Sequence, residues 1–195
     1  MNTVVNLFHP HLEQSRVNRA WGERLASESS ITVRRLYELY PDGKINVALE
    51  QAVLEAHDRI VFQHPLRWYS VPPLMKQWLD DVLTYGWAYG STGKALHGKE
   101  WLSCISTGGP ADSYQAGAYN HYAMSEILKP LQQTANLIGM TYLPPFILHG
   151  ADSASPAQIQ GSAETMLAHV LDARLNPQLK LAALLAEIDA ETSAA

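Results

Sequence analysis

The stretch DRIVFQHPLRWYSVPP, residues 58–73, decides how the rest of the chain is interpreted. Its first six residues contain an apolar run that predicts a buried strand over 58–63. Pro72 and Pro73 suit the first turn of a helix, where a missing N–H costs little, and apolar side chains then recur at helical spacing to residue 83. The aromatic segment in between, with Trp68 and Tyr69, is either a turn packed on a core or the rim of a pocket for a flat ring.

The same alternation of strand and helix runs along the chain in both directions. We predict strands over 3–8, 31–36, 58–63, 101–106 and 140–148, the last interrupted by two prolines. Helices are expected after an N-cap at Ser15 and over 48–56, 72–83, 123–138 and 156–175. Such alternation predicts an α/β three-layer sandwich, in which helices cover both faces of a five-stranded parallel sheet. We expect one domain over residues 1–180 and a simple C-terminal tail over 181–195 that frays.

Composition narrows the class of protein. The chain has 195 residues, of which 47% are hydrophobic and 17% charged, with a net charge of −5. This charge argues against a nucleic-acid surface, which needs a basic stripe. A single cysteine, Cys104, excludes an internal disulfide, and we see neither a secretory signal nor a membrane span, so we expect a cytoplasmic protein. The eight histidines are scattered, so we expect no metal site.

Ligands of parallel sheets bind at the carboxyl ends of the strands, so the loops after the predicted strands carry the function. The loop HPHLEQSRVN, residues 9–18, leads into a helix N-terminus that can hold an anion, although ordinary capping by Ser15 is the alternative. The loop STGGPADSY, residues 106–114, has paired glycines that let backbone N–H groups approach a ligand, or simply make a tight turn. Together with the aromatic segment, these loops suit a phosphate-bearing ligand with a flat polar ring, such as flavin mononucleotide (FMN).

The chain resembles the flavodoxin-like NAD(P)H:quinone oxidoreductases of the DT-diaphorase type. Within them it is most similar to the ancillary proteins of the glutathione-gated potassium efflux systems (Kef type). The matching pieces lie between residues 9 and 146: HP, SRVN, QHPLRWYSVPPLMKQWLDDVL, GWAYG, ALHGK, STGGP and LPPF. The resemblance implies an FMN-binding domain that accepts hydride from NAD(P)H and passes it to a quinone by a ping-pong mechanism.

The resemblance also implies roles for individual residues. Phosphate and ribityl contacts fall on His9, Ser15, Arg16, Val17 and Asn18; the isoalloxazine is lined by Leu66, Arg67, Trp68 and Tyr69; and the pyrimidine edge meets Ser106, Thr107, Gly108 and Gly109. Gly108, Gly109 and Tyr114 are the residues expected to stabilise charge on the flavin, as in an oxyanion hole. His121 is the nearest candidate for a family histidine beside Tyr114.

Two other functions stay open. The chain could instead be a soluble regulatory subunit of a potassium/proton antiporter, held at the inner membrane by that partner. It could also be a small electron carrier, but those are strongly acidic and hold phosphate with a glycine- and hydroxyl-rich loop. We further expect a homodimer, because the segment YGWAYG at 85–90 carries three aromatic side chains that are hard to bury in one small domain.

Overall fold

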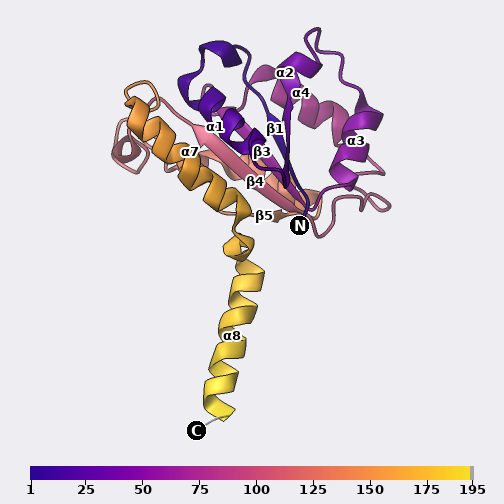
Figure 1. Ribbon diagram of the computed structural model, residues 1–195. Helices are drawn as coiled ribbons and strands as arrows, with labels where there is room; N and C mark the ends of the chain where they lie inside the picture. Colours follow the sequence, from indigo (N-terminus) through magenta and orange to yellow (C-terminus); the bar gives the residue numbers. More distant parts are fainter. Residues whose placement is uncertain (194–195) are drawn as a thin grey trace.

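A parallel sheet forms the centre of the structure, a computed structural model that describes residues 1–193 (Figure 1). Its strands are β1 (Thr3–Leu7), β2 (Ile31–Arg35), β3 (Arg59–Pro65), β4 (Glu100–Ser106), β5 (Thr141–Tyr142) and β6 (Phe146–Leu148). The order is β2-β1-β3-β4-β5, and β6 also pairs with β4. The predicted last strand is therefore split into two, because Pro144 and Pro145 between them have no N–H to donate to the ladder.

Helices cover both faces of this sheet, as predicted. The helical segments are η1 (Leu12–Gln14), α1 (Arg16–Ala26), α2 (Leu36–Leu39), α3 (Val47–Glu55), α4 (Pro73–Val82), η2 (Ala111–Ser113), α5 (Met124–Ile127), α6 (Lys129–Leu137), α7 (Pro156–Leu171), η3 (Ala173–Leu175) and α8 (Pro177–Ser193). Helices α1 and α7 lie side by side on one face, and α3 and α4 lie on the other (Figure 1). The predicted flavodoxin-like α/β fold is thus confirmed.

Two apolar layers, one on each face of the sheet, form the core. In the first layer the ring of Phe62 stacks on Trp101 at 4.1 Å and meets the edge of Trp78 at 5.6 Å between ring centroids. In the second layer Trp21 packs against Phe146 at 5.4 Å. Neighbouring residues of a strand enter opposite layers, because side chains alternate along β structure. Cys104 is buried in the second layer, and burial raises the pKa of its thiol.

Three sequence predictions about helices and aromatics need correction. The single helix expected over 123–138 is divided into α5 and α6, because Pro130 has no N–H with which to continue the helical bonds across Leu128. Helix α7 ends at Leu171 rather than at residue 175. The indole of Trp87 donates to Glu55 Oε1 at 2.6 Å and packs on the first apolar layer, which leaves Tyr85 and Tyr89 as the exposed aromatics of that loop.

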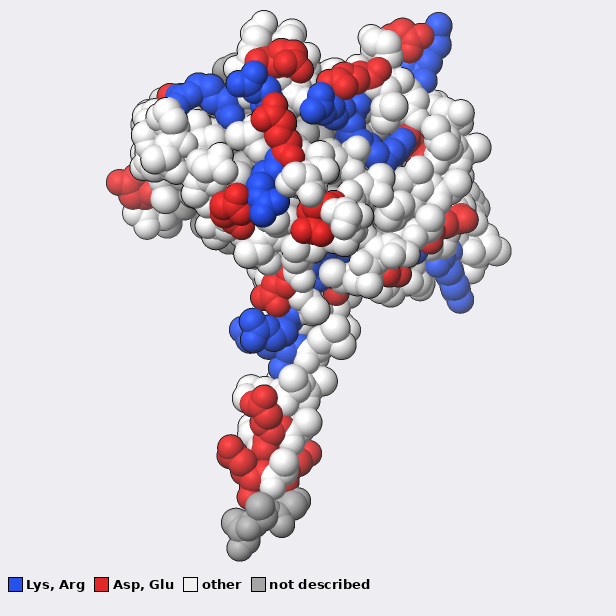
Figure 2. All heavy atoms as spheres, viewed as in Figure 1, with Lys and Arg blue, Asp and Glu red and all other residues white. Residues whose placement is uncertain are grey.

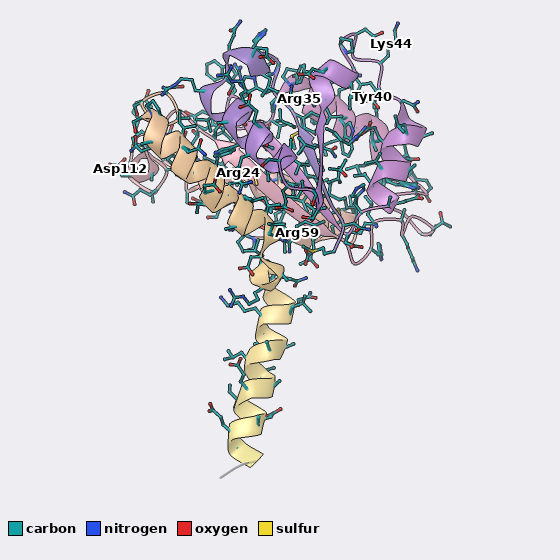
Figure 3. All side chains as sticks on the ribbon, in the orientation of Figure 1. Arg24, Arg35, Tyr40, Lys44, Arg59 and Asp112 are labelled. Atoms are coloured by element: carbon teal, nitrogen blue, oxygen red, sulfur yellow. The ribbon has the colours of Figure 1, made fainter. Side chains whose placement is uncertain are left out.

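The C-terminal segment also differs from the expected fraying tail. Helix α8 runs from Pro177 to Ser193 and projects away from the domain (Figure 1). It begins just after a buried anchor, in which Arg59 donates to the carbonyls of Val170 (2.6 Å) and Asp172 (3.1 Å) (Figure 3). Residues 194–195 of the predicted tail lie outside the described residues. Over residues 1–193, no helix is both long and apolar enough to cross a membrane.

A buried carboxylate ties α3 to the rest of the first layer. Glu50 is fully buried, and its oxygens accept two hydrogen bonds of 2.6 Å from the Arg34 guanidinium and one of 2.9 Å from the Trp78 indole. Tyr40 also donates its hydroxyl to Glu50. Burial alone would raise the pKa of this carboxyl, but the hydrogen bonds from Arg34, Tyr40 and Trp78 lower it below its ordinary value. The carboxylate is therefore charged and fully partnered.

We predict that Glu50→Gln lowers the free energy of unfolding by about 3 kcal/mol, because Arg34 is left as a nearly buried charge without its counter-ion. A group whose pKa is lowered by folding stabilises the protein above its unfolded pKa and loses that contribution as the pH falls through its folded pKa. As the pH falls, the free energy of unfolding should therefore decrease less in the variant than in the wild type. Urea unfolding between neutral and acidic pH measures both effects.

The matched control is Glu164→Gln, which removes an exposed carboxylate that accepts from Arg24 at 2.8 Å. Its effect should be far smaller, since solvent screens this pair. Equal effects of the two substitutions would show that the Glu50 network does not hold α3 in place.

Candidate functional site

A cleft of about 520 Å³ opens at the carboxyl edge of the sheet. Four loops meet there, those that follow β1, β3, β4 and β6. The lining residues are His9, His11, Gln14, Ser15, Arg16, Val17, Asn18, Pro65, Leu66, Arg67, Ser106, Thr107, Gly108, Ala151 and Asp152. Volume and composition fit a small polar ligand of nucleotide size.

The β1 loop presents the N-terminus of α1 to this cleft. Ser15 is the N-cap, and its Oγ accepts a hydrogen bond of 3.1 Å from the N–H of Asn18. The Ser15 hydroxyl keeps its own hydrogen for donation to a ligand, so the capping role and the anion-binding role are compatible. Arg16 donates to the carbonyl of Ala154 at 2.6 Å and so ties the β1 loop to the segment before α7.

His9 is a neutral residue of this cleft. Its pKa is lowered to about 4, first by burial and then by its electrostatic interactions with Arg67 and His11. Nδ1 accepts a hydrogen bond of 3.1 Å from the backbone N–H of His11. The neutral ring therefore carries its hydrogen on Nε2, where it can act as a donor to an anion.

The aromatic segment after β3 is a tight hairpin. Arg67 and Ser70 exchange backbone hydrogen bonds of 3.0 and 2.9 Å, and the two residues between them have positive φ, 48° for Trp68 and 59° for Tyr69. Two consecutive positive φ angles are typical of a type I′ turn, which favours Asn and Gly and is strained for bulky side chains. The turn points Trp68 outward, so that 94% of its surface is exposed. The strand leading into it is as predicted, whereas its two aromatic side chains are exposed and are not among the residues that line the cleft.

The glycines after β4 are in close contact with two other groups. A Cβ at Gly108 would lie 2.6 Å from the Asp152 carboxylate, and one at Gly109 would lie 3.0 Å from the Tyr114 ring. The Tyr114 hydroxyl shares a short hydrogen bond with Thr107 Oγ1. The ring beside Tyr114 is that of His149, at 5.3 Å between centroids, where His121 was the candidate from sequence. Burial lowers the pKa of His149, which is consistent with a neutral ring at this place.

Most residues predicted for the site therefore meet in one place. Ten of them line the cleft: His9, Ser15, Arg16, Val17, Asn18, Leu66, Arg67, Ser106, Thr107 and Gly108. Trp68, Tyr69, Gly109 and Tyr114 are not among the lining residues. Trp68 and Tyr69 follow the lining residue Arg67 in sequence, and Tyr114 is hydrogen-bonded to the lining residue Thr107. Asn18 has a structural role as well, since its side chain is buried and donates to Ser106 Oγ at 2.8 Å.

Sequence reasoning missed the fourth loop, which supplies Ala151 and Asp152. The rule used for the other loops could have found it, because this segment also follows a strand at the carboxyl edge. Gln14 and His11 were within the quoted loop but were not singled out. Among residues 1–193, no group of three or more His, Cys, Asp or Glu side chains is arranged to hold a metal ion.

Comparison with known proteins identifies the family. A family model described as "Flavodoxin-like fold" matches residues 1–170. The chain belongs to this family. A curated relative, the uncharacterized NAD(P)H oxidoreductase YdeQ of Bacillus subtilis (strain 168), is 49% identical over 189 residues, which cover 97% of this chain and 96% of YdeQ.

Three solved structures share the fold and much of the sequence. General stress protein 14 of Treponema denticola, in complex with FMN, is 42% identical with a TM-score of 0.84, over 87% of this chain and 98% of its own. An NADPH-quinone reductase of P. pentosaceus is 32% identical with a TM-score of 0.80, over 88% of this chain and 99% of its own. A protein named as a thermophilic tryptophan halogenase of Streptomycin violaceusniger is 51% identical with a TM-score of 0.85, over 88% of this chain and 99% of its own. The names of the last two proteins describe different reactions.

We predict that the double substitution Trp68→Asn with Tyr69→Gly raises the free energy of unfolding by about 1–2 kcal/mol, because Asn and Gly adopt the positive φ angles of the turn without strain. Chemical denaturation of the apoprotein measures this change. FMN affinity of the same variant should not rise with stability, since strain of this kind is kept where a ligand is held.

The control is Tyr69→Phe, which removes only the hydrogen bond of 3.0 Å from the Tyr69 hydroxyl to Asn120. If the double variant is no more stable than Tyr69→Phe, the hairpin is not strained by its side chains.

Proposed function

We propose that this protein is an FMN-dependent NAD(P)H oxidoreductase that uses a quinone as its acceptor. The observation that carries the proposal is the convergence of four loops on one cleft, which brings together a helix N-terminus, neutral hydrogen-bond donors and Gly108. The FMN complex of the Treponema denticola relative and the names of YdeQ and of the P. pentosaceus reductase support it.

The phosphate of FMN is proposed to bind at the β1 loop. The N-terminus of α1 offers unpaired N–H groups and the positive end of the helix dipole. Ser15 can donate its hydroxyl hydrogen, and the neutral His9 ring can donate from Nε2. Asn18 holds this helix end against β4 through Ser106 and acts as a positioning residue. Asp152, whose carboxylate accepts hydrogen bonds, suits the hydroxyls of a ribityl chain.

The ring of FMN is proposed to lie between the β3 and β4 loops. Bound FMN supplies the hydride chemistry, accepting from NAD(P)H and donating to the acceptor. The backbone N–H groups of Gly108 and Gly109 face the pyrimidine edge and stabilise negative charge there. Tyr114, held by Thr107, supports the same edge. Leu66 and Arg67 contact the ring, and Trp68 and Tyr69 form its outer rim.

Donor and acceptor are proposed to use the same side of the site in turn, which gives a ping-pong mechanism. The β3 and β4 loops both border the cleft, and a ring held between them would leave one side for both planar partners. A regulatory role at an antiporter stays a prediction from the sequence. Tryptophan halogenation, which the name of one solved relative suggests, is the second reaction to assay with the same purified protein.

The test is FMN binding by Gly108→Val compared with Gly161→Val. A side chain at Gly108 projects toward Asp152 within the cleft, so we predict at least a roughly tenfold loss of FMN affinity, or about 1.4 kcal/mol. Gly161 lies in α7 with open space at its Cβ position, so the matched variant should bind like the wild type. Fluorescence quenching of FMN during titration with apoprotein measures both affinities.

Equal affinities in the two variants would place the FMN site elsewhere. Failure of the wild type to bind FMN at micromolar concentration would overturn the proposed function itself.

A further inference from the structure

Helix α8 carries an apolar stripe that the described domain does not cover. Leu181, Leu184, Leu185 and Ile188 recur at the i, i+3, i+4 and i+7 spacing that places side chains on one face of a helix. Between 48% and 56% of the surface of each of these residues is exposed. Among the described elements, α8 has its main contacts with the adjoining η3. The stripe therefore has room for a partner along its whole length.

The start of α8 is fixed, so the helix has a defined direction. Arg59 is fully buried at the base of the sheet and donates from Nε to Glu100 Oε2 at 2.8 Å (Figure 3). The other oxygen of Glu100 accepts from Asn176 at 3.0 Å, and Asn176 directly precedes α8. The buried pair thus holds the residue from which the helix begins. A helix of this length without tertiary packing is only marginally stable in water, so a partner on the stripe would stabilise it.

The helix is an addition to the family domain. The family model ends at residue 170, and the Treponema denticola and P. pentosaceus structures are almost completely matched by less than nine-tenths of this chain. The alignment with YdeQ covers 97% of the chain. The stripe on α8 is therefore not needed to build the flavin-type domain, which is consistent with a separate role.

We propose that α8 pairs with α8 of a second copy of this chain in an antiparallel arrangement. A two-fold axis between Leu184 and Leu185 brings Leu181 of one helix opposite Ile188 of the other. Leu184 then meets Leu185 of the second copy, and the two stripes cover each other. Such a contact is self-complementary, as a two-fold interface requires.

Charge selects this arrangement and this partner. Lys180, Glu187 and Glu191 lie on the same flank of the stripe, because residues seven and eleven apart return to nearly the same side of a helix. In the antiparallel pair, Lys180 lies at the level between Glu187 and Glu191 of the second copy. In a parallel two-fold pair, the flanks that carry these charges lie on opposite sides of the two helices, so Lys180 does not meet Glu187 or Glu191 of the second copy. The separation is visible in Figure 2, where the basic side chains near the domain are followed by acidic side chains at the far end of the helix.

Disulfide crosslinking tests the pairing directly. Full-length chains with Leu181→Cys and with Ile188→Cys, carrying different tags, are mixed and oxidised with diamide, which takes up the two electrons and two protons released as the S–S bond forms. We expect mostly the mixed 181–188 dimer. The natural thiol, Cys104, is buried and does not compete. Leu179→Cys, on the opposite side of the helix and 58% exposed, replaces Leu181→Cys in the control and should crosslink weakly.

Charge variants of the Leu181→Cys and Ile188→Cys pair complete the test. Lys180→Glu in both chains should lower the mixed yield roughly fivefold, and the further change of Glu187→Lys and Glu191→Lys should restore it. Three outcomes would overturn the proposal: no mixed dimer, equal crosslinking in the Leu179→Cys control, or preferential crosslinking of Leu181→Cys chains with themselves. An unchanged yield in Lys180→Glu would contradict the antiparallel charge pairing.

Discussion

The loops of this protein are held together by backbone hydrogen bonds that continue past the ends of the strands. Phe8 donates to the carbonyl of Gln63 at 2.8 Å, Leu66 to Ser106 at 2.8 Å, and Thr107 to Leu148 at 3.0 Å. Each bond joins the first part of one loop to the neighbouring strand or loop. The four segments therefore leave the sheet at fixed positions relative to one another, and the cleft is a direct consequence of the strand order β2-β1-β3-β4 with β6 beside β4.

Buried side chains extend this connection to helix α1. Asn18 donates to Ser106 Oγ, and Gln63 donates to the Asn18 carbonyl at 2.8 Å. The first turn of α1 is thereby held against β3 and β4. The N–H groups of that turn and the glycines after Thr107 then border the same space. This geometry lets one ligand meet a phosphate-type site and a ring-edge site at once, and it explains why hydrogen-bonded residues such as Asn18 belong to the site without needing to touch a ligand.

The sequence was sufficient for the fold and for much of the site, because both depend on local patterns. Apolar runs, the N-cap at Ser15 and the two prolines at the start of α4 each mark an element within a few residues. What it could not give depends on contacts between distant segments. The hairpin at Trp68 and Tyr69 is formed by backbone hydrogen bonds between Arg67 and Ser70, although the identity of its side chains argues against such a turn. The direction of α8 depends likewise on Arg59, more than a hundred residues earlier in the chain.

The central claim is that this cleft binds FMN and transfers hydride in two separate half-reactions. The most direct test is anaerobic mixing of the FMN-loaded protein with NADH or NADPH, followed by a quinone in a second mix. The account predicts that the absorption of oxidised flavin is lost completely with the donor alone and returns fully with the quinone. It would be contradicted if the absorption persisted until donor and quinone were present together, or if neither donor changed it.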